Sequence, residues 1–206
     1  MLEKITRDFV MIWTTVDPIS NLALFAGLTG SLTIRERRRT ALRASIYSAV
    51  ILVLAVVIGQ IVLDAMGVRL RSLQLAGGII LFLFGLQMLF GTATQQQVPT
   101  DKGRDLAVFP LAVPAIAGPG AIMAVIVLTD NDVFTVPQQA QTAAVLLVVL
   151  ALNYVLLLLS DVVLRIIGQQ GASVLARVMG MVLCALSVEL VMNALGIGSW
   201  ATPRHR

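Results

Sequence analysis

The sequence predicts an all-α integral membrane protein, and three observations support this fold class. First, 58% of the 206 residues are hydrophobic and only 13% are charged, whereas soluble domains carry about 25% charged residues. Second, the apolar residues form continuous runs of about 20 residues, the length that crosses a bilayer as a helix. Third, these runs lack the alternating pattern of an outer-membrane β-barrel. The lipid bilayer is therefore the first expected partner of the chain.

Six windows of the sequence have the length and composition of transmembrane helices. They are residues 9–29, 44–64, 73–92, 107–129, 142–161 and 174–195. The connections are short and polar, and the longest, residues 93–106, contains the segment TQQQVPTDKGRD. We therefore expect a single membrane domain over residues 1–206. Within it, repeat one covers about 9–92, a solvated loop covers 93–106, and repeat two covers about 107–195.

The distribution of basic residues predicts the orientation of these spans. Nine of the 15 Lys and Arg residues lie in or beside the loops after spans one, three and five, including the RERRR cluster at 35–39. Lys and Arg are enriched in cytoplasmic loops, so these loops are expected inside and both termini outside. The chain is then a multi-pass protein of the inner (plasma) membrane. The positive net charge reflects this topology, and no nucleic-acid partner is expected.

The chain contains an internal repeat of about half its length. VDPISNLALFAGLT in span one matches AGPGAIMAVIVLTD in span four when Pro18 is aligned with Pro119. Span three matches span six when Gly78 is aligned with Gly180, so the two offsets differ by a single residue. Three spans per half is an odd number, so the second copy must be inverted in the membrane. Inverted repeats are typical of secondary transporters. The alternative is that any two apolar helices resemble each other.

Spans one and four each contain a helix-breaking sequence near the middle. Asp is a preferred N-cap and Pro a preferred first helical residue, so Asp17-Pro18 can end one half-helix and start another. Gly118-Pro119-Gly120 can do the same, and its glycines leave backbone amides bare. A half-helix that begins inside the membrane offers unpaired N–H groups and a partial positive charge to a solute. The alternative is a simple kink in which Asp17 caps its own helix and binds nothing.

Other polar residues inside the spans add to these candidates. Asn21 lies four residues after Asp17 and so on the same helical face. It lines the site or bonds to a neighbouring helix. Asn153, in span five, can hydrogen-bond between helices. Glu189 is an ionisable residue within span six and therefore a candidate for ion coupling, together with Asp17. An interfacial position near the end of the span also explains Glu189.

At these residues the sequence resembles the MarC family of six-span bacterial and archaeal membrane proteins. The resemblance is carried by DPISNLALF, RERRRTALRAS, LQLAGGIILFLFGLQMLFG and VPAIAGPGAIMAVIVL, and it covers residues 9–195. It implies small neutral amino acids as the substrate class. Ser20 departs from the pattern, because it stands where the family commonly has Gly. The candidate substrate-binding residues are Asp17, Pro18, Ser20, Asn21, Gly118, Pro119 and Gly120.

The leading functional hypothesis is a secondary transporter of a small polar solute, most simply a neutral amino acid, coupled to a proton or sodium gradient. The sequence has no phosphate-binding Gly-rich loop with its Lys, so ATP is not expected to drive it directly. An enzyme is not expected, because the only histidine is His205 and the only cysteine is Cys184. Neither a cofactor nor a metal is expected. A passive channel and a non-transporting scaffold or assembly factor remain as alternatives.

Overall fold

The computed structural model describes residues 2–90 and 105–197, and the regular elements in these ranges are all helices. They are α1 (Leu2–Val16), α2 (Pro18–Thr29), α3 (Ile34–Ala65), α4 (Leu70–Phe90), the irregular helix η1 (Ala107–Ile116), α5 (Pro119–Leu128), α6 (Val136–Leu158) and α7 (Ser160–Ala194). Five helical stretches in the described ranges are long and apolar enough to cross a membrane, and η1 with α5 makes a sixth if counted as one bent span. The all-helical membrane fold predicted from composition is confirmed.

Several helices extend beyond the apolar windows that predicted them. α3 begins at Ile34 rather than at residue 44, so the basic cluster at 35–39 forms the first turns of a helix and not a loop. The Thr33 hydroxyl accepts a hydrogen bond from the Glu36 amide, and the Glu36 carboxylate accepts one from the Thr33 amide. This capping box satisfies two backbone donors at the helix start. Hydropathy detects only the apolar part of a helix, so its charged end was missed.

The last predicted span is also part of a longer helix. α7 begins at Ser160, directly after the end of α6 at Leu158, so the connection between spans five and six is helical. Within α7 the chain bends at Gly168, whose φ of 72° is a left-handed conformation that glycine adopts without strain. The apolar part of α7 follows this bend. The predicted loop at 93–106 lies almost wholly outside the described residues.

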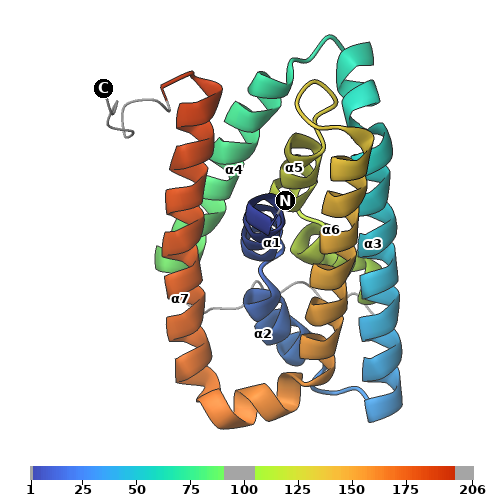
Figure 1. Cartoon of the computed structure of the whole chain (residues 1–206). Coiled ribbons are helices and arrows are strands. Elements are labelled where there is room, and N and C mark those ends of the chain that lie inside the picture. Colours follow the sequence, from blue (N-terminus) through green and yellow to red (C-terminus); the bar gives the residue numbers. More distant parts are fainter. Residues whose placement is uncertain (1, 91–104, 198–206) are drawn as a thin grey trace.

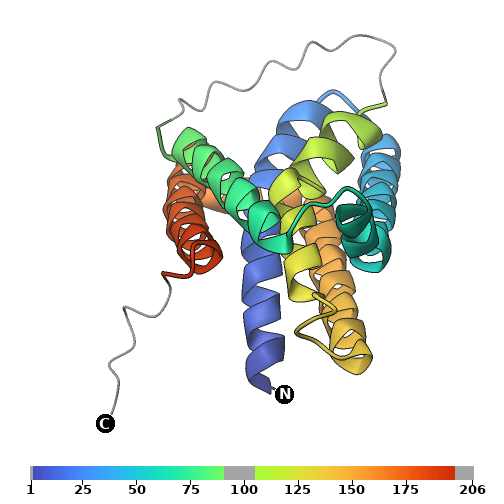
Figure 2. The same cartoon turned by 90° about the horizontal axis from the view of Figure 1, so that it is seen from above.

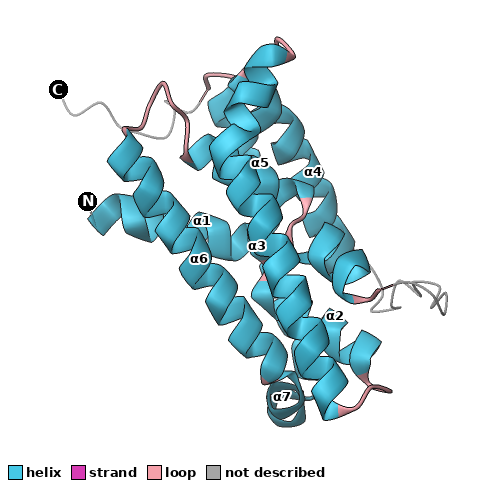
Figure 3. Cartoon of the chain, turned by 90° about the vertical axis from the view of Figure 1, so that its right-hand side faces the viewer, coloured by secondary structure: helices cyan, strands magenta, loops and turns pink. Residues whose placement is uncertain are grey.

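The helices form two antiparallel pairs around a central group (Figure 1). α3 and α6 contact each other and run in opposite directions, as do α4 and α7. Viewed from above, α1 and α5 lie between these two pairs (Figure 2). From the side, α3 and α6 lie beside each other along the same diagonal (Figure 3). The two interrupted segments, α1–α2 and η1–α5, therefore occupy the middle of the molecule.

The central segments form the packed core, whereas the long outer helices present apolar side chains outward. Ile12, Phe25, Ile116 and Met123 are almost completely buried, and all belong to the interrupted segments. Large apolar side chains on the outer helices are exposed instead, including Val57, Ile61, Leu83, Val162 and Met181. Soluble proteins rarely expose apolar surface on this scale. A bilayer around the outer helices would cover it.

Glycines bring α4 and α7 into direct backbone contact. A Cβ added at Gly85 would lie 2.8 Å from the Gly180 carbonyl oxygen, and one added at Gly180 would lie 2.8 Å from the Gly85 carbonyl oxygen. Real Cβ atoms do not approach so closely, so both positions require glycine. Small residues at helix contacts are the usual means by which membrane helices pack closely. This contact fixes the crossing point of the α4–α7 pair.

Candidate functional site

The break between α1 and α2 lies at Asp17. α1 ends at Val16, Asp17 has the left-handed φ and ψ of 49° and 67°, and α2 begins at Pro18. The Asp17 side chain accepts a hydrogen bond from the Ser20 amide at 3.3 Å, which is the predicted N-cap. Asp is among the few residues that tolerate a left-handed conformation. Local chemistry therefore explains why the helix ends and restarts here.

Asn21 connects this break to α6. Its Nδ2 donates a hydrogen bond of 2.7 Å to the Val16 carbonyl, which would otherwise be an unsatisfied group at the end of α1. The same Nδ2 lies 3.5 Å from Oδ1 of Asn153 on α6. Asp17, Asn21 and Asn153 are all buried. We refer to Asp17, Ser20, Asn21 and Asn153 as the break cluster.

Two polar atoms of the break cluster have no hydrogen-bond partner. Ser20 Oγ and Asn153 Nδ2 are both buried and unpaired. An unsatisfied buried donor or acceptor costs about 1–3 kcal/mol, so native proteins seldom keep one without a reason. The cluster therefore combines one carboxylate with two unpaired groups that can donate hydrogen bonds. A small solute carrying both a cationic and an anionic group would satisfy this set.

The second interruption separates η1 from α5, which are inclined by 53°. Gly118 has an extended conformation and precedes α5, whose first residue is Pro119. A Cβ added at Gly118 would lie 2.6 Å from the Pro114 carbonyl oxygen, so the turn requires glycine. A Cβ added at Gly120 would overlap the Leu81 side chain of α4. The Gly120 backbone, expected to face a solute, is covered by Leu81.

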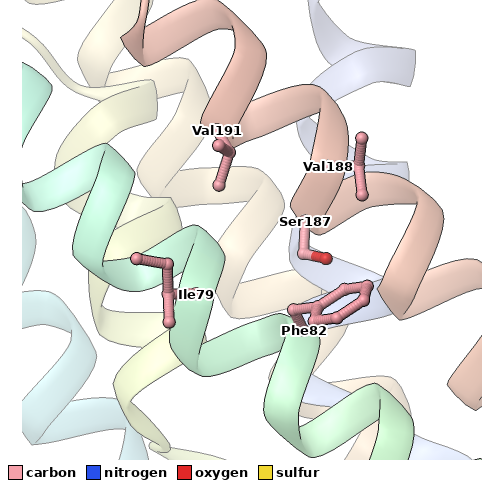
Figure 4. Close-up of a pocket in the computed structure, with 5 residues that line it drawn as sticks. All are labelled: Ile79, Phe82, Ser187, Val188 and Val191. Carbon is pink, nitrogen blue, oxygen red and sulfur yellow. The ribbon is translucent and has the colours of Figure 1, made fainter.

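One cavity in the described part of the chain is lined by residues of α4 and α7 rather than by residues of the two breaks (Figure 4). It has a volume of about 210 Å³ and lies between α4 and α7. Its lining is formed by Ile79, Phe82, Ser187, Val188 and Val191. None of the sequence-predicted site residues contributes to it. Its apolar lining and position between two outer helices fit a packing defect at a helix crossing better than a polar binding site.

Glu189, the second coupling candidate, is not joined to the break cluster. It is exposed on α7, and its carboxylate accepts a hydrogen bond of 3.2 Å from Asn193 one turn further along the same helix. This geometry matches the interfacial alternative considered for Glu189. Among residues 2–90 and 105–197, no group of three or more His, Cys, Asp and Glu side chains is placed to bind a metal ion.

The structure reveals a buried ionic cluster that sequence reasoning missed. Lys4 and Asp8 on α1 meet Thr142 on α6, and the Asp8 side chain is fully buried. We refer to Lys4, Asp8 and Thr142 as the α1–α6 cluster. The apolar window of span one began at residue 9, so Asp8 lay just outside the predicted span. The available signal was the spacing of four residues between Lys4 and Asp8, which places them on one helical face.

Arg37, from the basic cluster at 35–39, has a structural role at the end of the molecule opposite the α1–α6 cluster. Arg37 pairs with Asp161 and donates hydrogen bonds of 3.0 Å to both Ser160 and Thr29. Its guanidinium also lies over the Phe25 ring. These contacts join the end of α2 and the start of α3 to the α6–α7 junction. Arg37 therefore contributes to packing as well as to the charge pattern that sets topology.

Comparisons with known proteins agree with the fold and composition. A family model described as "MarC family integral membrane protein" matches residues 2–197. A membrane protein of Archaeoglobus fulgidus is 35% identical over 200 residues, covering 91% of this chain and 90% of the relative. The inner membrane proteins MarC of Citrobacter koseri and Escherichia coli are 30% and 29% identical, covering 94% and 95% of each chain. No solved structure matches the chain significantly. The chain belongs to the MarC family of integral membrane proteins.

Proposed function

We propose that this chain is a secondary transporter of the inner membrane that carries small neutral amino acids and is driven by a proton or sodium gradient. The observation that carries this proposal is the break cluster, in which polar groups with two unpaired atoms are buried at a helix break. Irregular backbone at membrane depth is tolerated only where it is enclosed by protein or lines a cavity. A solute-binding role explains why this arrangement is kept.

The chemistry of the break cluster matches an amino-acid zwitterion. The Asp17 carboxylate can accept hydrogen bonds from an α-ammonium group. Asn153 Nδ2 and the Ser20 hydroxyl can donate to an α-carboxylate, and both lack a partner. The start of α2 adds the partial positive charge of a helix N-terminus. The cluster is already enclosed by α2 and α6, so a solute with little or no side chain requires the smallest displacement of its neighbours.

We also propose that the two halves of the chain are inverted repeats, because local features recur at a spacing of 101 or 102 residues. The capping box of Thr33 and Glu36 has a counterpart in Thr135 and Gln138, 102 residues later. The left-handed glycines Gly67 and Gly168 are 101 residues apart. The antiparallel courses of α3 against α6 and of α4 against α7 fit two copies in opposite orientations (Figure 1).

Contacts between α4 and α7 support a two-fold relation between the repeats. Cys184 Sγ contacts the carbonyl oxygen of Phe82, and these two residues are 102 positions apart. A Cβ at Gly78 would lie 3.1 Å from the Ser187 carbonyl oxygen. Adding 102 to Gly78 and subtracting 102 from Ser187 gives Gly180 and Gly85, whose contact is also close. Such reciprocity is the property of an isologous interface. Transporters with inverted repeats bind their substrates between the repeats, near the bilayer midplane.

Substitution of Asn153 tests the proposal. Asn153→Leu keeps the branching of the side chain and removes the unpaired Nδ2 donor, while Asn21 keeps its hydrogen bond to Val16, so the protein should still fold, at a cost of about 1–3 kcal/mol for the larger buried side chain. It should lose exchange of glycine and alanine, measured as counterflow of labelled solute into liposomes preloaded with unlabelled solute. Asn193→Leu is the matched control, because Asn193 is exposed on α7. Thermal unfolding in detergent measures the stability of both variants.

The same assay distinguishes the alternatives. Counterflow by the parent, lost only in Asn153→Leu, supports a transporter with its site at the break cluster. Uptake that is not accelerated by preloaded solute indicates a passive channel. An absence of any flux of these amino acids in the parent contradicts the proposal and favours a scaffold. Normal counterflow by Asn153→Leu would remove the break cluster as the site.

A further inference from the structure

The α1–α6 cluster is a compact triangle of hydrogen-bonding atoms. Lys4 Nζ lies 2.5 Å from Asp8 Oδ2 and 2.6 Å from Thr142 Oγ1, and these two oxygens are 2.6 Å apart. The Asp8 side chain is fully buried, whereas the Lys4 side chain retains 11% of its exposure. The ammonium group also lies 4.4 Å from the centre of the Phe134 ring. The protein thus places one of its own cations in an enclosed polar site.

The surroundings of that ammonium group are those of a small-cation site. Thr142 Oγ1 lies 3.1 Å from the Gln138 carbonyl oxygen and 3.5 Å from the Leu128 carbonyl oxygen. Leu128 is the last residue of α5, so the partial negative charge of a helix C-terminus is directed at the cluster. A carboxylate, a hydroxyl and nearby carbonyl oxygens are the groups that hard cations prefer.

The second carboxylate oxygen of Asp8 has no hydrogen-bond donor. Asp8 Oδ1 is buried and unpaired. Arg7 Nε lies 3.9 Å from Asp8 Oδ1, beyond hydrogen-bond distance, and the Arg7 side chain is 57% exposed. The contacts described for Asp8 thus involve the charges of Lys4 and Arg7 from α1 and the neutral Thr142 from α6. The carboxylate of Asp130, in the α5–α6 connection, is bonded to Gln60 instead. A buried carboxylate oxygen without a donor is a place where a proton or a small cation gains a partner.

We propose that Asp8 is the site of the coupling cation, where a proton or a sodium ion binds, displaces Lys4 and changes the contact between α1 and α6. This inference rests on the proposed transport function. A proton forms an O–H bond at Oδ1, which neutralises the carboxylate and removes its attraction for Lys4. A sodium ion takes oxygens of Asp8 and Thr142 as ligands and displaces the Lys4 ammonium toward solvent. In both cases a positive charge from solution takes the place of the Lys4 ammonium group beside Asp8.

The position of Asp8 explains how such binding would reach the break cluster. Asp17 follows directly after the end of α1 and is nine residues from Asp8, or about 13 Å at 1.5 Å per residue. α1 is continuous up to Val16, so movement of its first turns is transmitted to the break as a rigid unit. The cation and the solute then occupy separate sites joined by α1. Binding at one site changes the conformation available to the other.

The first experiment compares gradient-driven accumulation with counterflow in liposomes containing the full-length protein. Asp8→Asn should reduce accumulation of labelled glycine to the level measured without a gradient while counterflow continues. A pH gradient and a sodium gradient, imposed separately on the parent, identify which cation drives accumulation. Asp105→Asn is the matched control, since it removes a partly exposed pair with Arg43 and should leave accumulation unchanged. Full accumulation by Asp8→Asn overturns the proposal.

A second variant and a second measurement test the proposal even if Asp8→Asn does not fold. Lys4→Met combined with Asp8→Asn removes both charges together, which proteins tolerate better than the loss of one partner. The protection factors of amide hydrogen exchange over residues 2–16, from which the intrinsic pH dependence of exchange has been removed, should change in the parent at low pH or in sodium and stay constant in the double variant. Exchange in the parent that responds to neither cation overturns the proposal. If exchange responds but the parent shows no counterflow, the transport function fails and the cation site stands.

Discussion

At the scale of single residues, Asp17 combines a backbone role with a charge, and substitutions can separate them. Its φ of 49° requires a residue that tolerates the left-handed region, and its side chain caps α2. Asn retains both properties and removes only the charge, because Asn caps about as well as Asp and also tolerates this conformation. Gly retains the conformation but loses the cap. Ala loses both.

We predict that Asp17→Asn folds like the parent but loses gradient-driven uptake or much of its affinity for glycine. Asp17→Gly should also lose uptake, with a stability loss of only a few tenths of a kcal/mol for the missing cap. Asp17→Ala should be the least stable of the three, since it adds backbone strain. Thermal unfolding in detergent and uptake into liposomes measure the two effects. Uptake by Asp17→Asn that equals the parent's would show that the residue only caps the helix.

Gly120 is a residue whose sequence interpretation changes once its neighbours are known. From the sequence, a bulky substitution there would block the approach of a solute to bare amides. In the structure, Leu81 already covers this position, so added atoms at Gly120 would first displace the contact between α4 and α5. Loss of activity in a Gly120 variant would therefore report packing as well as binding. Asn153, which has an unpaired donor, is the more informative position.

At the scale of helices, the glycine contact between α4 and α7 gives a prediction about stability. Gly180→Ala should destabilise the protein by about 1–3 kcal/mol, because the added methyl group would overlap the backbone of α4. Gly27→Ala is the matched control, since nothing lies within 4 Å of a Cβ at this position in α2. It should be neutral or stabilising, because Ala favours helix over Gly by about 1 kcal/mol. The midpoints of thermal unfolding measure both changes, and equal effects at the two sites would contradict the contact.

At the scale of the whole molecule, the two ends of the helices can be assigned to opposite sides of the membrane. Arg37 binds Ser160, which places the start of α3 beside the α6–α7 junction. At the other end, Gln60 binds Asp130, which places the end of α3 beside the α5–α6 connection. The first end contains the basic cluster at 35–39 with Arg43 and Arg165, whereas Lys4, Arg7, Arg69 and Arg71 lie at the second. The positive-inside rule therefore predicts that the first end faces the cytoplasm.

Cysteine labelling tests this assignment. In a Cys184→Ala background, cysteines at Arg38 and Arg165 should be protected from a membrane-impermeant maleimide in intact cells. Cysteines at Gly67 and Asp132 should be labelled, because both follow helix ends on the opposite side. The reverse pattern would invert the orientation and leave the fold unchanged. Equal labelling of cysteines at positions 38 and 132 in intact cells would contradict the arrangement in which the two ends of α3 lie on opposite sides of the membrane.

The features that the sequence predicted are those set by a few neighbouring residues. The helical membrane fold follows from apolar runs of bilayer length, and the end of α1 follows from the capping and backbone preferences of Asp17-Pro18. The family was also recognised from short segments in a fixed order. Each of these signals is local in the chain or independent of the partner helix.

The features that only the tertiary structure decided depend on residues far apart in the chain. Asp8 became a buried group because Thr142, 134 positions later, lies against it. Asn153 joined the break cluster because α6 packs beside Asn21. Leu81 covers Gly120 because α4 packs on α5. Burial and pairing are properties of the space between helices, and local sequence does not specify which side chains share that space.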